Sequence, residues 1–299
     1  MQTENNFKAI NYHKTKAQLN TSLRVVKIEK NKKMNINKMR IIIAVALIIS
    51  TISSCGIKRP NKINEGVTST VYNDLSENLL KNLKTNKSVT DIQDKLENIT
   101  EDELKEVLKL DEQRKAFWIN VYNGYIIAIL KKDKKAFNDR GAFFSKKQIK
   151  IAGNLLSFDD IENGMIRKSQ FKFGLGYVGK IFPSSFERSL RVKERDFRIH
   201  FAINCGAKSC PPVRIYTAKI VNEQLENATK VYLTDFTKYS KEKNSVETST
   251  LMSWFRGDFG GKAGTKKILK ELKLIPNSSN PAVTFGSYDW ALDINNYAN

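Results

Sequence analysis

The pattern of apolar and polar positions from about residue 67 onward predicts a series of helices. Three segments, 69–84, 88–99 and 100–110, repeat apolar residues at the spacing of one helical face. In the first segment this face holds Val71, Leu75, Leu79, Leu80 and Leu83. Thr100 can cap the third helix, and acidic residues follow it in the first turn. We expect these three amphipathic helices to cover a more apolar element.

Segment 114–132 is that element, because it is apolar on nearly every side. A helix of this kind is either buried or spans a membrane, and its length and its internal polar residues favour burial. Asn120 and Asn123 lie three residues apart and therefore share a face. Buried amides need hydrogen-bond partners. These two either fix a neighbouring backbone or line a polar pocket.

The remaining pattern alternates short strands with helices. We predict a hairpin over 148–158 that turns at Gly153-Asn154, a buried strand over 196–204, and late strands within 245–255 and 281–293. Further helices are predicted over 157–168, capped by Ser157, over 217–236, capped by Thr217, and over 265–273. Residues 169–195 are glycine-rich and then basic, and they predict no element. The fold class is α+β, with a long buried helix on a small, mostly antiparallel sheet and an N-terminal helical cover.

The N-terminal region has the order of a secretory signal. In "NKKMNINKMRIIIAVALIISTISSCG" a basic region precedes a short apolar run, Ile41 to Ile52, which is shorter than a membrane span of roughly 20 residues. Small residues then precede Cys55, as in the lipobox of bacterial lipoproteins, in which the cysteine receives lipid. We therefore predict lipidation at Cys55, export, and anchoring to a bacterial membrane.

These features divide the chain into four parts. Residues 1–54 are a signal region with an upstream extension, since Met34 or Met39 could each start the protein. Residues 55–66 are a polar tether, 67–113 a helical cover, and 114–299 the main domain.

The chain is strongly basic, with a formal net charge of +20. Residues 1–54 hold ten basic and two acidic residues, so the rest carries a net charge of +12. The basic residues are spread along the chain, which is typical of a solvated surface or of attraction to anionic envelope components. No nucleic-acid recognition motif is present. We predict no nucleic-acid partner and no cofactor.

The segment "RIHFAINCGAKSCPPVR", 198–214, holds most of the candidate chemistry. His200 is the only histidine after the predicted signal, and Cys205 and Cys210 are the only cysteines besides Cys55. In an exported chain the two cysteines could form a disulfide. They could also be buried thiols, or one could be a nucleophile. A zinc site is the weakest reading, because three ligands with this spacing do not match a usual site.

A catalytic thiol requires a base and a group that orients the base. On a regular strand, His200 and Cys205 would point to opposite faces. Cys210 follows the turn "GAKS" and is therefore the freer partner. The group that orients His200 could be Asn120, Asn123, Asp159 or Asp289.

Four segments together resemble one known family. They are "AFWINVYNGYII" (116–127), "LSFDDIENGMIR" (156–167), "RIHFAINCGAKSCPPVR" (198–214) and "YDWALD" (288–293). In this order they resemble the domain-of-unknown-function 547 (DUF547) family, over about residues 114–293. The closing motif departs slightly, with Ala291 and Asp293 where the family commonly has serine and asparagine. The resemblance implies a bacterial envelope protein with one main domain, and it supplies no reaction.

Two function hypotheses follow. The first is a non-catalytic domain that binds an envelope ligand or protein, with a pocket that includes His200 and Asp289; its binding residues are Asn120, Asn123, Asn204 and Arg214. The second is a thiol-dependent hydrolase or transferase, in which Cys210 or Cys205 attacks, His200 acts as base, and Asp289 orients it.

Overall fold

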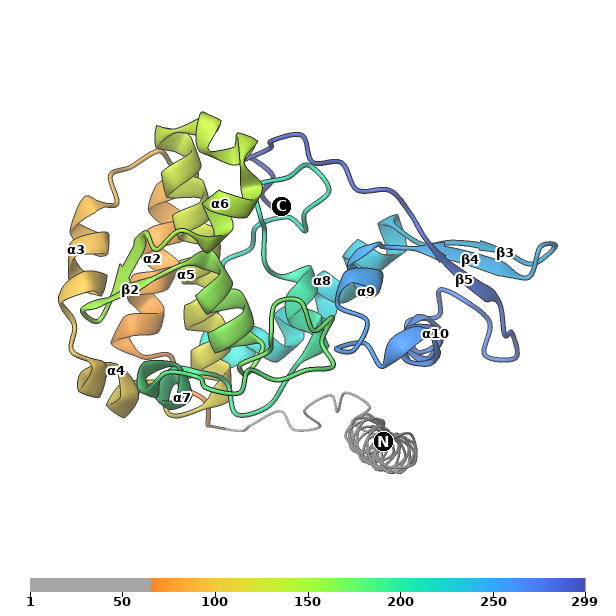
Figure 1. Ribbon diagram of the computed structural model, residues 1–299, viewed down its shortest axis with the longest axis horizontal. Helices are drawn as coiled ribbons and strands as arrows, with labels where there is room; N and C mark the ends of the chain where they lie inside the picture. The colour runs from red at the N-terminus through yellow and green to blue at the C-terminus, as the bar shows by residue number, and fades with distance from the viewer. Residues whose placement is uncertain (1–65, 299) are drawn as a thin grey trace, which may run out of the picture. The chain divides into compact units, whose positions relative to one another are not determined.

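The computed structural model describes residues 66–298, all of which belong to one compact unit, Gly56–Asn299. Its first part is helical (Figure 1). The helices here are α2 (Val71–Lys84), α3 (Thr90–Asn98), α4 (Glu101–Val107), α5 (Asp111–Lys132), η1 (Lys134–Asn138) and α6 (Arg140–Ser145). The three predicted covering helices and the long buried helix are confirmed.

Helix α5 is the centre of the larger hydrophobic core. Nearly all of its residues are buried, and Phe117, Trp118 and Ile119 are fully enclosed. Helix α2 packs closely against it, since a methyl group at Gly124 would come within 2.5 Å of the Leu79 side chain. Acidic residues in the first turn of α5 and lysines in its last turn complement the helix dipole.

The strands form two small sheets. The hairpin of β1 (Ile149–Ile151) and β2 (Asn154–Leu156) is antiparallel, and Ile149 and Ile151 join the core around α5. The second sheet has the order β3 (Lys238–Ser240), β4 (Ser245–Thr248), β5 (Ala282–Phe285). Strands β3 and β4 are antiparallel, whereas β4 and β5 are parallel. The α+β class is thus confirmed, with one parallel pair.

The second sheet belongs to a smaller hydrophobic cluster of its own. Val246 and Val283 pack there with residues of α8 (Val221–Asp235), α9 (Leu251–Trp254) and α10 (Gly261–Glu271). The short helix η3 (Phe197–Phe201) joins the two clusters, because Phe197 and Phe201 pack in the smaller one and Ile199 in the larger. Figure 1 shows this sheet and α10 on the far side of α8 from α2 and α3.

The predicted strand over 196–204 is wrong, because residues 197–201 form a 3₁₀ helix. The Asp196 carboxylate accepts a hydrogen bond from the backbone N–H of Arg198 at 3.1 Å and so starts a turn. The apolar residues that suggested a buried strand face two different cores. His200 and Cys205 are therefore not placed on opposite faces of a strand.

Other elements differ in smaller ways. The predicted helix over 157–168 contains a π-helix, η2 (Asp160–Ile166), and the Ser157 hydroxyl accepts from the Asp160 N–H as expected of a cap. Segment 245–255 is a strand only as far as Thr248 and then becomes α9. Thr217 caps no helix with its side chain, although η4 (Ala218–Ile220) and α8 follow it. Helix α7 (Ser185–Leu190) lies in the segment that had no predicted element.

Among residues 66–298, no helix combines the length and the apolar composition needed to cross a bilayer. The predicted signal region, Cys55 and most of the polar tether lie outside the described residues.

Candidate functional site

A cavity of about 420 Å³ lies where the two hydrophobic clusters meet. Side chains from α5, η2, η3, α9 and the closing segment contribute to its wall. The lining residues are Tyr122, Phe144, Asp159, Glu162, Asn163, Lys172, Phe173, Leu175, His200, Ile203, Cys205, Pro211, Leu251, Trp254, Phe255, Tyr288 and Trp290. This wall is mainly apolar and aromatic with a few polar groups, as is usual for ligand sites.

His200 and Asp258 form a buried pair on this cavity. The His200 Nε2 lies 2.8 Å from Asp258 Oδ2, and only 1% and 5% of the two side chains are exposed. The His200 ring stacks on Phe255, with the ring centroids 4.0 Å apart. The position of the imidazole is thus fixed both by its hydrogen bond to Asp258 and by the stacking of its ring on Phe255.

The environment fixes the tautomer of His200. Burial lowers the pKa of the imidazole below its usual value, although Asp258 opposes this shift. Burial raises the pKa of the Asp258 carboxyl, but the hydrogen bond from His200 and the charge of Arg167 outweigh it and bring the pKa to about 2. A carboxylate only accepts, so Nε2 carries the proton. The Nδ1 is therefore a bare acceptor, and it is buried and makes no hydrogen bond within the described part of the chain.

A second buried ionic cluster holds the short helix that carries His200. Asp196 receives Lys115 Nζ at 3.2 Å and Arg198 Nη2 at 2.7 Å. Its pKa is lowered to about 2, because the hydrogen bond from Arg198 and the charge of Lys115 outweigh the effect of burial. Lys115 comes from α5, so this cluster ties η3 to the central helix.

Two arginines also hold the Asp258 carboxylate. Arg167 Nε donates to its Oδ2 at 2.8 Å, and Arg195 Nη1 lies 3.3 Å from its Oδ1. The backbone before it approaches another chain segment very closely: a Cβ at Gly257 would lie 2.4 Å from the carbonyl carbon of Gly176. Only glycine fits at this crossing.

Carboxylates line another part of the cavity. Burial raises the pKa of Glu162, although the charge of Arg167 opposes the shift. The Tyr122 hydroxyl donates to the Glu162 Oε2 at 3.4 Å. Asp159 pairs with Lys172 Nζ at 2.6 Å. Asp159 and Glu162 thus supply hydrogen-bond acceptors to the cavity wall.

Three large aromatic side chains pack on one another at the cavity. The rings of Trp254 and Trp290 stack with centroids 5.6 Å apart, and Tyr288 contacts both. Trp254 comes from α9, whereas Tyr288 and Trp290 belong to the closing motif. Arg140 also lies over the Trp290 ring, 4.6 Å from its centroid.

The structure places Cys205 and Cys210 as a disulfide pair, with their Cα atoms 6.2 Å apart. Cys205 lines the cavity, while Cys210 is almost fully buried. The Tyr288 hydroxyl donates to Cys210 Sγ at 3.1 Å. Among the predicted thiol readings, this geometry favours the bridge.

The predicted binding asparagines act on the backbone instead. Asn120 donates to the Tyr216 carbonyl at 2.7 Å and accepts from the Tyr216 N–H at 2.9 Å. Asn123 donates to the Ala202 carbonyl at 2.9 Å and accepts from the Asn204 N–H at 2.8 Å. Asn204 in turn fixes its own loop through Pro211 and Gly206. None of the three is among the cavity-lining residues.

Two other predicted residues lie apart from the cavity. The Asp289 side chain is 51% exposed and lies 3.7 Å from Lys208, so it does not orient His200. Asp258 has that position instead. Arg214 lines two smaller hollows next to α8. Cys55, the predicted lipid site, lies outside the described residues.

Within residues 66–298, no cluster of three or more His, Cys, Asp or Glu is arranged to hold a metal ion.

The sequence analysis did not predict four residues of the site, which are Asp258, Glu162, Trp254 and Tyr288. Glu162 and Tyr288 appeared there only as members of the family motifs. The sequence held one signal for Asp258. It lies in "RGDFGG", an acidic residue among glycines, which is typical of a backbone that must approach another segment closely.

Comparisons with known proteins agree with the motif resemblance. Residues 106–233 match the family described as "Protein of unknown function, DUF547". No match was found among curated proteins or among solved structures. The matched segment contains His200, both cysteines and the central helix, whereas Asp258 and Tyr288 lie after it. Residues 106–233 therefore match the DUF547 family, as the motifs in this part of the chain predicted.

Proposed function

We propose that this domain binds an organic ligand in the His200 cavity. The observation that carries the proposal is the buried, neutral His200, whose Nε2 is committed to Asp258 while Nδ1 has no partner among the described residues. An unpaired buried acceptor is costly. A ligand donor at Nδ1 would remove that cost.

The cavity wall defines the chemistry of the ligand. His200 Nδ1 and the Glu162 carboxylate accept hydrogen bonds, so the ligand presents hydroxyl or amide N–H donors. The side chains of Trp254, Trp290 and Phe255 add apolar aromatic surface to the wall. A ligand with donors at its edge and an apolar face fits both features, and a pyranose ring of an envelope glycan has this combination.

Tryptophan fluorescence gives a direct binding test, because two of the three tryptophans line the cavity. The probes are an N-acetylglucosamine tetramer and, for comparison, a tetra-alanine peptide. We expect the sugar to change the emission of the protein in a saturable way. Saturation by the peptide alone would contradict the glycan assignment.

His200→Gln is the matched variant. The glutamine amide can donate to Asp258 as Nε2 does, but it offers no acceptor at the position of Nδ1. We expect the variant to fold and to bind the sugar about fivefold more weakly, as expected from the loss of one hydrogen bond. Unchanged affinity in this variant would contradict the role of Nδ1.

We also propose that a lipid on Cys55 tethers this binding domain to a bacterial membrane from the exported side. The basic region, the apolar run and the Ser-Ser-Cys sequence support this. Several acyl chains anchor a protein stably. A mass spectrum of the mature protein gives the test: a lipidated N-terminus at Cys55 is expected, and a chain that keeps residues 1–54 would contradict the tether.

The thiol-dependent hydrolase stays as an alternative only for the reduced protein. In the bridge neither sulfur is a nucleophile, and the thiolate is the reactive form. Cys205 lines the same cavity as His200, which keeps the hypothesis testable. Labelling with iodoacetamide before and after reduction separates the two readings. The binding proposal expects labelling at Cys205 only after reduction.

A further inference from the structure

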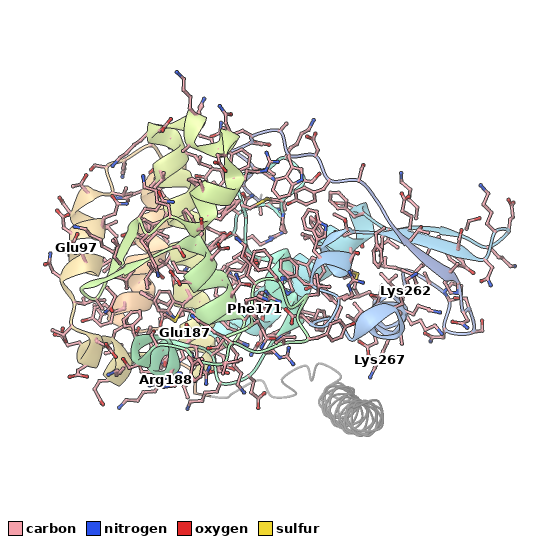
Figure 2. The ribbon with its side chains drawn as sticks, in the orientation of Figure 1. Glu97, Phe171, Glu187, Arg188, Lys262 and Lys267 are labelled. Carbon is pink, nitrogen blue, oxygen red and sulfur yellow. A yellow bond between two sulfur atoms is a disulfide. The ribbon has the colours of Figure 1, made fainter. Side chains whose placement is uncertain are left out.

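Exposed apolar side chains gather in one short segment. Among the described residues, thirteen large hydrophobic side chains are exposed, and seven of them lie within residues 171–182. They are Phe171, Phe173, Leu175, Tyr177, Val178, Ile181 and Phe182. Ile181 is 81% exposed and Phe182 is 88% exposed. Figure 2 labels Phe171 in this segment. Soluble surfaces rarely carry so many contiguous apolar side chains without a partner.

The segment is tied to the body of the domain. Within the segment the Phe171 N–H donates to the Val178 carbonyl at 2.9 Å, and from outside it the Gly257 N–H donates to the Leu175 carbonyl at 2.8 Å. Arg195 Nη1 donates to the Gly176 carbonyl at 2.9 Å. The backbone is therefore anchored while its apolar side chains remain in solvent.

The charged residues within this part of the sequence have one sign. Residues 163–186 contain no acidic residue. Lys172 pairs with Asp159 and Lys180 with Glu187, yet each lysine side chain stays 40% exposed. Lys168 is exposed and has no ion-pair partner among the described residues. Lys262 is also exposed and lies near the segment in the fold. The residue before it, Gly261, is so close that a Cβ added there would lie 3.5 Å from the Tyr177 hydroxyl.

We propose that segment 171–182 docks on the surface of an anionic phospholipid bilayer, with Ile181 and Phe182 entering the interface. Aromatic and aliphatic side chains beside lysines are the composition of an interfacial membrane anchor. Lysine is depleted in protein–protein interfaces, whereas its long stem suits the bilayer surface. The charge pattern therefore favours lipid over a protein partner.

This surface adjoins the cavity. Lys172, Phe173 and Leu175 belong both to the segment and to the cavity wall. Docking therefore brings this wall of the cavity next to the bilayer. The inference requires neither the ligand nor the lipid on Cys55, so it stands apart from the proposed function.

A tryptophan placed in the segment reports insertion directly. Phe182→Trp and the control Val71→Trp, at a 65% exposed position on α2, are made in the full chain. Both are mixed with vesicles that contain phosphatidylglycerol and phosphatidylcholine with brominated acyl chains, which quench tryptophan at the acyl depth. Every variant keeps residues 1–65, so attachment through that region is common to all.

We expect brominated vesicles to quench Phe182→Trp more than the unsubstituted chain, while Val71→Trp matches the unsubstituted chain. Equal quenching of the two variants would overturn the docking proposal. This is also the result expected if the segment binds a protein and not a bilayer. Insertion should also weaken in vesicles of phosphatidylcholine alone. Equal insertion there would overturn the role of the lysines.

Lys168→Gln tests the charge at one residue. One lysine near an anionic surface contributes about a fivefold change in partitioning. We expect Lys168→Gln in the Phe182→Trp background to need about five times more anionic vesicles for half-maximal quenching. Lys243→Gln, at an exposed lysine on the β3–β4 turn, is the control and should leave the midpoint unchanged. An identical midpoint for both lysine variants would overturn the assignment of Lys168.

Discussion

His200 is the residue on which the site depends, because burial and Asp258 together decide its protonation. Its pKa in the folded protein lies below the ordinary value, chiefly through burial. The groups that act on it are Asp258, Arg167 and Asp196. An imidazole that stays neutral while it donates from Nε2 is a permanent acceptor at Nδ1.

This lowered pKa predicts a pH dependence of stability. The unfolded chain binds a proton at His200 near its ordinary pKa of about 6.5. The folded chain binds it only at lower pH. The contribution of neutral His200 to the free energy of unfolding is therefore fully present above this value and is lost as pH falls towards the folded pKa.

Urea denaturation at pH 7 and pH 5 measures the effect. We expect the free energy of unfolding to fall more in the unsubstituted chain than in His200→Gln, by at most about 1.4 kcal/mol per pH unit. Asp258 and Asp196, with pKa values of about 2, titrate below this window. Parallel pH profiles of the two proteins would show that the His200 pKa is not lowered.

Asp258 balances the buried guanidinium of Arg167, and this predicts a stability cost for Asp258→Asn. The substitution removes the charge but keeps the shape, so Arg167 remains buried without a counter-ion. Breaking such a pair costs about 3–5 kcal/mol. Asp289→Asn, at an exposed carboxylate next to Lys208, should change unfolding by about 0.5 kcal/mol or less. Similar losses in both variants would contradict the ion-pair account.

At the scale of elements, α5 positions the site through its buried amides rather than through contact with a ligand. Asn123 satisfies the Ala202 carbonyl and the Asn204 N–H just after η3. We expect Asn123→Ala to lower the free energy of unfolding by about 2 kcal/mol or more, because both groups lose their partner in the interior. Asn98→Ala, at an exposed position on α3, is the control for thermal or urea unfolding and should have little effect. A stable Asn123→Ala that loses ligand would instead restore Asn123 as a binding residue.

The crossing of segment 171–182 with the Asp258 turn gives a further prediction. Any Cβ at Gly257 would overlap the backbone at Gly176, so Gly257→Ala forces the two segments apart. Overpacking of this kind costs about 1–3 kcal/mol. Gly179→Ala in the same segment has no neighbour nearer than 3.8 Å and should be tolerated. Both are compared by urea denaturation, and equal stabilities would mean that the crossing opens freely.

The elements that the sequence predicted well are those set by local pattern. The apolar faces of 69–84 and 114–132 require burial, and both helices form as expected. The β1–β2 hairpin also forms as predicted, although its turn lies at residues 152–153 and not at Gly153-Asn154, because Asn154 already pairs with Ile151. The 3₁₀ helix at 197–201 was missed, because its apolar residues divide between two cores and Asp196 turns the backbone. The order of apolar and polar residues in the sequence does not show which of two hydrophobic clusters each side chain will join.

The site was predicted in part. His200 and Cys205 lie on the cavity, but Asp289 and the asparagines do not. The partner of His200 is 58 residues away in sequence, beyond any local pattern. The glycines around Asp258 are evident in the sequence. The reason for Gly257, its close approach to the backbone of Gly176, is evident only in the fold.

For the whole molecule, the Cys205–Cys210 bridge is a covalent link within the larger hydrophobic cluster. It closes a short loop, so its effect on the unfolded chain is modest. The loop-entropy relation gives about 2 kcal/mol. We expect dithiothreitol to lower the free energy of unfolding by about this amount, and Cys205→Ser/Cys210→Ser to be insensitive to it. Equal sensitivity of the double variant and the unsubstituted chain would show that the bridge does not form.

The proposed site depends on the protonation state of one imidazole, that of His200, in the folded chain. The chain has two histidines, His13 and His200, so the ¹⁵N–¹H long-range NMR spectrum of its imidazoles is simple, and His200→Gln assigns the signals. At neutral pH we predict a neutral His200 with its proton on Nε2 and an unprotonated Nδ1. A proton on Nδ1, or a charged imidazolium at neutral pH, would contradict the account.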